Sequence, residues 1–133
     1  MTQEQKDLFL KDLCARLPYF TKVQIKNEIV VLDSICDDDG YHFNFIGDDR
    51  DGVNIENIKP YLFPLSSMTD EQKEELNNMF NQEDDICEKI KTDNFEFSFY
   101  RKSIFDFLNK YHFDWRGLIP MGLANDATGK NIY

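Results

Sequence analysis

Hydrophobic positions change their spacing twice along this chain of 133 residues. From residue 3 to residue 17 they recur at the spacing of an amphipathic helix. From Thr21 to Ile58 they tend to alternate with polar residues, which is the period of half-buried strands. After Thr69 the helical spacing returns. The pattern therefore predicts a β half between two helical parts, which is an α+β fold.

A capping box opens the first predicted helix. Thr2 and Gln5 have the spacing at which each side chain accepts a hydrogen bond from the other residue's backbone N–H. Pro18 ends the helix, because a proline cannot continue one, so we expect the helix within residues 3–17. Cys14 lies on the hydrophobic stripe and is expected in the core, where a thiol behaves as a small apolar group.

Short strands separated by turns are expected next. Residues 22–32 alternate on either side of a central turn, which predicts a hairpin. An Asp-rich turn ending at Gly40 leads to the alternating residues 41–46. The alternation resumes at Val53 and Ile55. About three to five such strands predict a small antiparallel sheet, or an SH3-like barrel if the sheet closes.

A proline segment joins the two halves of the chain. Pro60 and Pro64 exclude a continuous helix, because each lacks an N–H and disfavours the helical conformation of the residue before it. Tyr61, Leu62 and Phe63 stand between them and need a buried surface. We therefore expect an edge strand or an extended strap that closes the β half.

Helices dominate the expected second half of the chain. In chain order we expect a helix capped by Thr69, a helix or a loop at 81–94, a strand at Phe95–Phe99, a helix at 101–111, and a short helix at 115–121 capped by Asp114. The chain is expected to form one domain, with residues 1–18 as the N-terminal helix, 19–68 as the β half, 69–124 as a mainly helical half packed on it, and 125–133 as a frayed tail.

The composition adds a strong negative charge to this picture. The chain has 25 acids against 15 lysines and arginines, a formal net charge of −10. Residues 21–100 carry 19 of the acids and seven of the bases, so the charge is concentrated in the middle of the chain. Such a surface repels phosphate, and direct nucleic-acid binding is disfavoured. The acidity either serves solubility or engages a basic partner, and the sequence leaves both explanations open.

No motif for catalysis or metal binding stands out. The three cysteines form no CxxC pair. A calcium loop with Gly52 at its sixth position would have Gly47 first and Ile58 twelfth, so both anchoring carboxylates are missing. His42 and His112 are isolated in the sequence. We therefore expect no catalytic residue, metal or cofactor, and favour a non-enzymatic protein.

Aromatic and acidic side chains remain as candidates for contact with a partner. Trp115 and Arg116 are adjacent, and both residue types are enriched at interface hot spots. For the aromatic candidates, a place in the core is the competing explanation. The complete set of interaction candidates is Trp115, Arg116, Tyr61, Phe63, Asp48, Asp49, Glu83, Asp84 and Asp85.

Three segments carry a resemblance to a known family. They are LFLKDLCARLPY (8–19), VNIENIKPYLFPLSSMT (53–69) and FLNKYHFDWRGLIPMGLA (107–124). With them the chain resembles a family of small uncharacterised proteins encoded by gut Bacteroidota and by their phages and prophages. The family pattern tends to have a basic residue at Phe63 and a tyrosine at Trp115, where this chain departs from it. The resemblance implies a mobile-element origin and a cytoplasmic setting, and it implies no activity.

The leading functional hypothesis is a small acidic phage-type protein that acts in the cytoplasm through protein–protein contacts. In one version it is a nucleic-acid mimic directed against a basic host protein. One alternative is an enzyme or small-molecule binder whose site is assembled from distant histidines and acids. Another is a minor structural component of a virion or a replication complex. No apolar run approaches the roughly 20 residues of a membrane helix, and the oligomeric state stays open.

Overall fold

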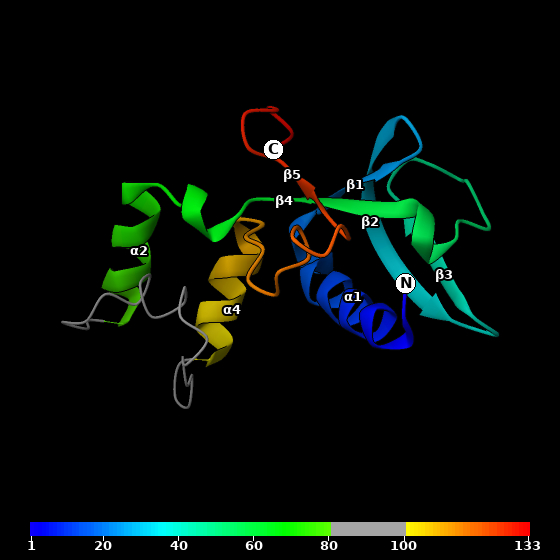
Figure 1. The fold of residues 1–133 in the computed structure, drawn as a ribbon, viewed down its shortest axis with the longest axis horizontal. Helices are drawn as coiled ribbons and strands as arrows, with labels where there is room; N and C mark the ends of the chain where they lie inside the picture. The colour runs from blue at the N-terminus through cyan, green and yellow to red at the C-terminus, as the bar shows by residue number, and fades with distance from the viewer. Residues whose placement is uncertain (81–100) are drawn as a thin grey trace.

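The structure, a computed structural model, describes residues 1–80 and 101–133 (Figure 1). Its helices and strands are, in chain order, α1 (Gln3–Arg16), β1 (Lys22–Ile25), β2 (Glu28–Asp37), β3 (Tyr41–Phe45), β4 (Ile58–Leu62), α2 (Asp70–Phe80), α4 (Arg101–Lys110) and β5 (Asn125–Asp126). Short 3-10 helices are η1 (Leu17–Tyr19), η2 (Ile55–Asn57) and η3 (Leu65–Ser67). The predictions for 81–94 and Phe95–Phe99 fall outside the described residues. The α+β class is confirmed, and none of the described helices is long and apolar enough to cross a bilayer.

A five-stranded sheet in the order β3-β2-β1-β4-β5 forms the β half. The first four strands in this order pair antiparallel with their neighbours, whereas β5 pairs in parallel with the end of β4. The sheet is therefore mixed rather than purely antiparallel. The order of these described strands is open, with β3 and β5 at the two edges, so they do not close into an SH3-like barrel.

The proline segment forms β4, which lies inside the sheet rather than at its edge. Pro60 lies opposite Val23 of β1, and on the other side Tyr61 lies opposite Asn125 of β5. Pro60 has no N–H to donate, and it stands one residue before the pairing with β5 begins. The prediction of an edge strand is wrong because β5 comes from the distant tail and covers the end of β4.

The connection from β3 to β4 is not the strand expected from Val53 and Ile55. Residues 46–54 form turns and irregular backbone, and Ile55 begins η2. The side chain of Asn54 accepts a hydrogen bond from Glu56 N at 3.0 Å and so favours a local turn over strand pairing. Val53 and Ile55 instead pack at the side of the core, partly buried.

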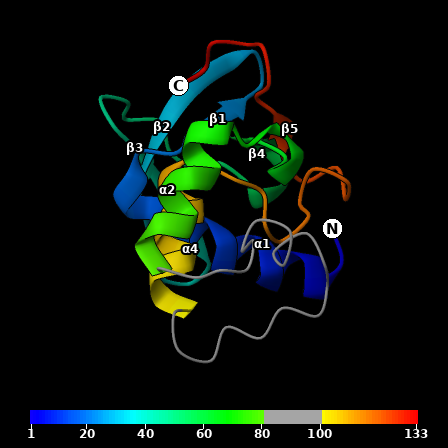
Figure 2. The same cartoon turned by 90° about the vertical axis from the view of Figure 1, so that its left-hand side faces the viewer.

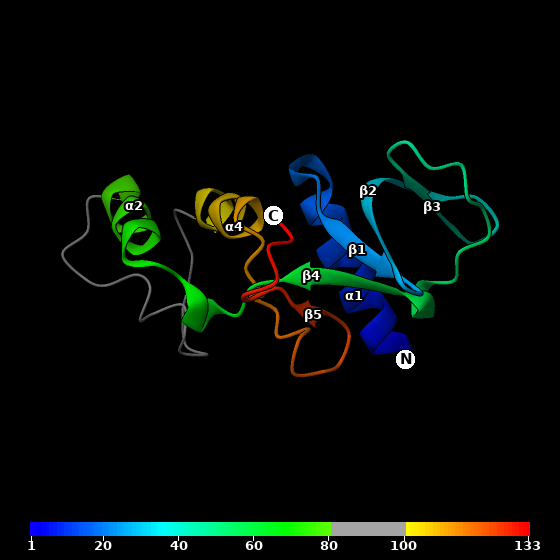
Figure 3. The same cartoon turned by 90° about the horizontal axis from the view of Figure 1, so that it is seen from above.

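Helix α1 begins and ends as the sequence predicts. Gln5 N donates to Thr2 Oγ1 at 3.1 Å and Thr2 N donates to Gln5 Oε1 at 2.9 Å, which completes the capping box. The helix lies across one face of the sheet (Figures 1 and 3). Cys14, expected in the core, is exposed. It follows the buried Leu13 by one position, about 100° around the helix, and so leaves the buried face.

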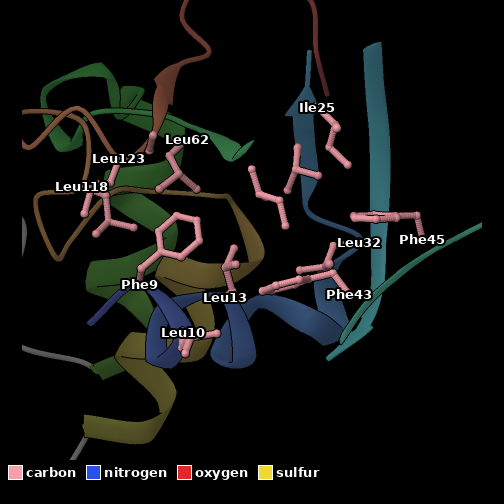
Figure 4. Packing of buried hydrophobic residues seen from close by; sticks show 13 residues of the cluster. Phe9, Leu10, Leu13, Ile25, Leu32, Phe43, Phe45, Leu62, Leu118 and Leu123 are labelled. Carbon is pink, nitrogen blue, oxygen red and sulfur yellow. The ribbon is translucent and has the colours of Figure 1, made fainter. Parts of the chain in front are cut away.

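The main core fills the space between α1 and the sheet (Figure 4). Side chains from α1 point towards those of β2 and β3, and residues from the chain after α4 close one side. The buried members of this core are Phe9, Leu10, Leu13, Val23, Ile25, Leu32, Phe43, Phe45, Ile58, Leu62, Leu118, Leu123 and Ala124.

Helices α2 and α4 contribute to a second, smaller core at the other end of the molecule (Figures 1 and 2). The cap predicted at Thr69 is present and forms a full capping box, since Gln72 N donates to Thr69 Oγ1 at 3.2 Å and Thr69 N donates to Gln72 Oε1 at 2.9 Å. The buried members of the second core are Met68, Leu76, Ile104, Phe107, Leu108 and Phe113.

The chain after α4 forms turns and not the short helix predicted at 115–121. His112 has a φ of 62°, and the N–H groups of His112 and the next residue bond back to helix carbonyls at 3.0 and 2.8 Å, which is a Schellman ending. Asp114 acts as a cap, since its carboxylate accepts hydrogen bonds from Leu118 N at 2.7 Å and Ile119 N at 2.8 Å. The capped element is a turn, because the chain then reverses to reach β5.

The C-terminal tail is held by the fold, so the prediction of a frayed tail is wrong. Tyr133 Oη donates to Tyr61 O at 2.9 Å and accepts from Lys22 N at 2.9 Å. Lys22 Nζ donates to Ile132 O at 2.6 Å. The Tyr133 ring also stacks on His112 with a centroid separation of 3.6 Å. These contacts tie the tail to β1, to β4 and to the end of α4.

Replacing Leu62 by Ala is expected to lower the free energy of unfolding by about 2–5 kcal/mol, because this β4 side chain is fully buried in the main core. Chemical denaturation of the wild type and the variant measures the difference. Lys59→Ala, at an exposed position of the same strand, is the matched control and should change stability by less than about 0.5 kcal/mol. A loss below about 1 kcal/mol for Leu62→Ala would contradict the burial of β4.

Candidate functional site

A buried ionic cluster attaches α1 to the chain that follows α4. The side chains of Asp12 and Arg16 are both fully buried. Arg16 donates from Nε to Asp12 Oδ2 at 2.7 Å and from Nη2 to Oδ1 at 3.1 Å, and Nη2 also donates to Phe113 O at 2.7 Å. Arg116 Nε lies 3.2 Å from Asp12 Oδ1. This cluster was not predicted from the sequence, although an acid and an arginine at positions i and i+4 beside the apolar stripe of α1 are a recognisable signal of an ion pair.

The predicted hot-spot pair, Trp115 and Arg116, lies beside this cluster. Trp115 stacks on Phe105 of α4, with 4.2 Å between ring centroids and 20° between the planes. Arg116 Cζ lies 4.0 Å from the centre of the indole, and Trp115 Nε1 donates to Asn109 Oδ1 at 2.9 Å. The indole is therefore held through its ring and its N–H, and it forms a rigid, half-buried wall.

This wall lines an open groove of about 400 Å³ between α1 and α4. Lys11 and Asp106 place opposite charges along it, and Asn109 adds an amide. The described residues that line the groove include no histidine, cysteine or hydroxyl side chain. Across residues 1–80 and 101–133, no group of three or more His, Cys, Asp or Glu side chains is arranged to hold a metal ion. Two of the residues that line the groove, Trp115 and Arg116, are of types enriched at interface hot spots.

Tyr61 and Phe63 both take part in the packing of the chain, and Phe63 also lines a separate pocket of about 240 Å³. Tyr61 is only 7% exposed in β4. Phe63 is half-buried, and its ring centroid lies 6.5 Å from that of Phe113 and 5.9 Å from that of Tyr133. Neither ring lines the groove beside Trp115.

The acidic candidates at the end of β3 differ in what they contact. Arg50 Nε donates to both carboxylate oxygens of Asp48, at 2.9 and 3.0 Å. These hydrogen bonds lower the pKa of the Asp48 carboxyl below its ordinary value. Arg50 also forms an ion pair with Glu28, whereas Asp49 is exposed. The remaining acidic candidates, which lie outside the described residues, are Glu83, Asp84 and Asp85.

The two histidines lie on different parts of the molecule. His42 is exposed on β3, with Nε2 2.8 Å from a carbonyl oxygen of the preceding turn. His112 is 8% exposed after α4, and its Nδ1 makes no hydrogen bond within the described residues. Burial, and then the charges of Arg16 and Lys22, lower the pKa of His112 to about 4. Because β3 and α4 lie on opposite sides of α1, these histidines do not form a shared site (Figure 1).

Replacing Asp12 by Ala is expected to lower the free energy of unfolding by about 3–5 kcal/mol, because Arg16 would stay buried without its counterion. Urea denaturation at neutral pH measures the loss. Arg116→Ala is the comparison and should cost less, since Asp12 keeps Arg16 and the Arg116 side chain is 13% exposed. Equal losses for the two variants would show that Arg16 is not the dominant partner.

Replacing His112 by Asn is expected to make stability less sensitive to acid. In the wild type the unfolded chain takes up a proton on this imidazole near its ordinary pKa of 6.5, but the folded protein does so only near pH 4. Stability therefore falls as the pH is lowered from about 6.5 to about 4. Asparagine tolerates the φ of 62° and does not titrate.

The free energy of unfolding measured at several pH values gives the slope for each protein. His42→Asn, at an exposed position, is the control and should keep the wild-type slope. A wild-type slope in His112→Asn would contradict the role of the buried imidazole.

Known proteins add no further constraint. Comparison of the chain with protein-family models, with curated proteins and with solved structures finds no match. The role of the chain is therefore inferred from its own surface chemistry.

Proposed function

We propose that this chain is a protein-binding protein that engages a basic partner through the carboxylates around β3. Residues 33–51 carry seven acids and one base, Arg50. Arg50 forms ion pairs with Asp48 and Glu28. The other six carboxylates are exposed and make no ion pair within the described residues, and they belong to Asp33, Asp37, Asp38, Asp39, Asp49 and Asp51. This concentration of unpaired carboxylates is the observation that carries the proposal.

The mutual repulsion of these carboxylates does not stabilise the fold. Like charges close together repel one another and lower stability, and solubility is served as well by acids spread over the surface. Carboxylates on the strand beside β3 and at both ends of β3 attract a basic protein over about 8–10 Å in physiological salt and speed its association. The cluster therefore supports binding better than it supports solubility alone.

A nucleic-acid-binding protein is the partner class that we propose. Its basic surface is built to hold rows of phosphates, and a row of carboxylates offers it a similar negative field. In this version the chain imitates nucleic acid and blocks the partner. Such a role suits a phage or prophage protein directed against a host factor, which is part of the same proposal.

The charge cluster is tested by neutralising two carboxylates at a time. Asp38→Asn with Asp39→Asn keeps the turn, because asparagine tolerates the left-handed backbone of residue 39, where φ is 50°. Glu71→Gln with Glu74→Gln removes the same charge from exposed positions on α2 and is the matched control.

Each protein is immobilised and exposed to the heparin-binding fraction of a bacterial lysate. The wild type is expected to retain basic proteins at about 50 mM salt, to lose them by about 300 mM, and to release them to duplex DNA. The double asparagine variant should retain several-fold less than the glutamine control. Equal retention by the two variants, or retention unaffected by salt, would overturn the proposed contact. Retention that duplex DNA does not displace would overturn the nucleic-acid mimic alone.

A further inference from the structure

Within residues 1–80 and 101–133, the sheet has one edge long enough to bind another strand. β3 ends the strand order and has five residues, whereas β5 at the opposite edge has two. In both views with the long axis horizontal, β3 lies at the end of the molecule away from α2 (Figures 1 and 3). Proteins commonly protect such an edge with lysine, proline or a covering loop. The sequence of β3, YHFNF, contains neither lysine nor proline.

The pairing with β2 shows which backbone groups of β3 point outward. Ile46 N donates to a β2 carbonyl oxygen at 2.9 Å, so residue 46 faces β2. Along an antiparallel strand, the backbone N–H and C=O groups of successive residues point alternately towards the partner strand and away from it. The backbone groups of Phe45, Phe43 and Tyr41 therefore point away from β2. Asp48 N lies 3.4 Å from Phe45 O and covers that position. As far as the described part of the chain shows, the open part of the edge is therefore the backbone of Tyr41 and Phe43.

The side chains around this open edge select a cationic occupant. Asp37 ends β2 opposite Tyr41, and Asp38 and Asp39 lie in the turn that leads into β3; all three are exposed. Tyr41 is 50% exposed, and an aromatic ring in this position can hold an ammonium or guanidinium group against its face. Backbone pairing supplies affinity in strand addition, and the flanking side chains supply selectivity.

A second copy of this chain fits the edge poorly. Two copies joined through β3 would bring together two sets of seven acids, each set with one arginine. Such like charges repel, and the repulsion is strongest at the short distances of strand pairing. A basic partner meets the opposite field.

We propose that the backbone of Tyr41 and Phe43 binds an extended segment rich in lysine or arginine, which adds to the sheet as a further antiparallel or parallel strand beside β3. This inference rests on the proposed function and names its contact surface. In this proposal the acidic turn attracts the basic segment, and hydrogen bonds to the strand edge fix its position and direction.

The probe is a short synthetic peptide in which lysine and valine alternate. Calorimetric titration at low salt measures its affinity, and amide hydrogen exchange measures protection at Tyr41 and Phe43. A second peptide has the same sequence but carries N-methyl groups on alternate residues along one edge. The methylated peptide keeps every charge and side chain but cannot donate hydrogen bonds along that edge. Two versions are made, each methylated on one of the two sets of alternate residues, because either edge of the peptide can pair with β3.

Two variants of the protein separate the backbone from the side chain. Tyr41→Pro removes the outward N–H at a position where proline leaves the bonds to β2 in place. Tyr41→Thr keeps the N–H and loses the ring. Thermal unfolding checks that both variants are folded, and the methylated peptides give the same test on the unaltered protein if Tyr41→Pro is not.

We expect the unmodified peptide to bind and to protect the outward amides. At least one methylated peptide, and the Tyr41→Pro protein, should bind about tenfold more weakly or worse, whereas Tyr41→Thr should lose less. Equal binding of all the peptides, or no binding of the unmodified peptide, would overturn strand addition. If the variant Asp38→Asn with Asp39→Asn still retained less basic protein from the lysate fraction, the proposed function would stand without strand addition. Equal binding of an alternating serine–valine peptide would overturn the basic character of the occupant.

Discussion

A single buried carboxylate, that of Asp12, determines how the two halves of this protein meet. It lies on the face of α1 that packs inward, and it faces Arg16 of the same helix and Arg116 from the chain after α4. A buried ion pair demands accurate geometry, because a displaced partner leaves a charge without a counterion in a medium of low dielectric. Arg16 also donates to Phe113 O, and Phe113 lies beside Phe63 just after β4. One connected set of contacts therefore positions α1, the end of β4 and the end of α4.

The pairing of arginines with carboxylates also determines which surface charges remain without a counterion. Three of the four arginines in the chain, Arg16, Arg50 and Arg116, lie against carboxylates. Two of these contacts are with the buried Asp12, and so they neutralise no charge on the outside. The exposed acids of the β2–β3 turn are left without counterions in the described part of the chain, next to a strand whose outer backbone groups are open. Charge and hydrogen-bonding capacity thus coincide at one edge of the sheet, and this coincidence supports a role in binding.

Elements whose ends depend on near neighbours could be predicted from the sequence. The capping boxes at Thr2 and Thr69 set the starts of α1 and α2, because each box is complete within four residues. Alternation predicted the strands β1 to β3, and helical spacing predicted α4. For the candidate site, the sequence indicated Trp115 and Arg116 as a contact pair. It did not show the groove that they line, because that groove is formed only when α1 packs beside α4.

The sequence by itself thus determined the α+β class, the helices that carry their own caps, and the excess of acid in the middle of the chain. The tertiary structure decided what depends on partners far away. β4 became an inner strand because Asn125 pairs beside Tyr61, and the tail is held because Tyr133 reaches the same strand. No local pattern encodes such pairings, because each pairing forms only when a segment far away in the sequence packs against the strand. The acids before β3 could be read from the sequence, but only the strand order of the described residues places β3 at an edge of the sheet.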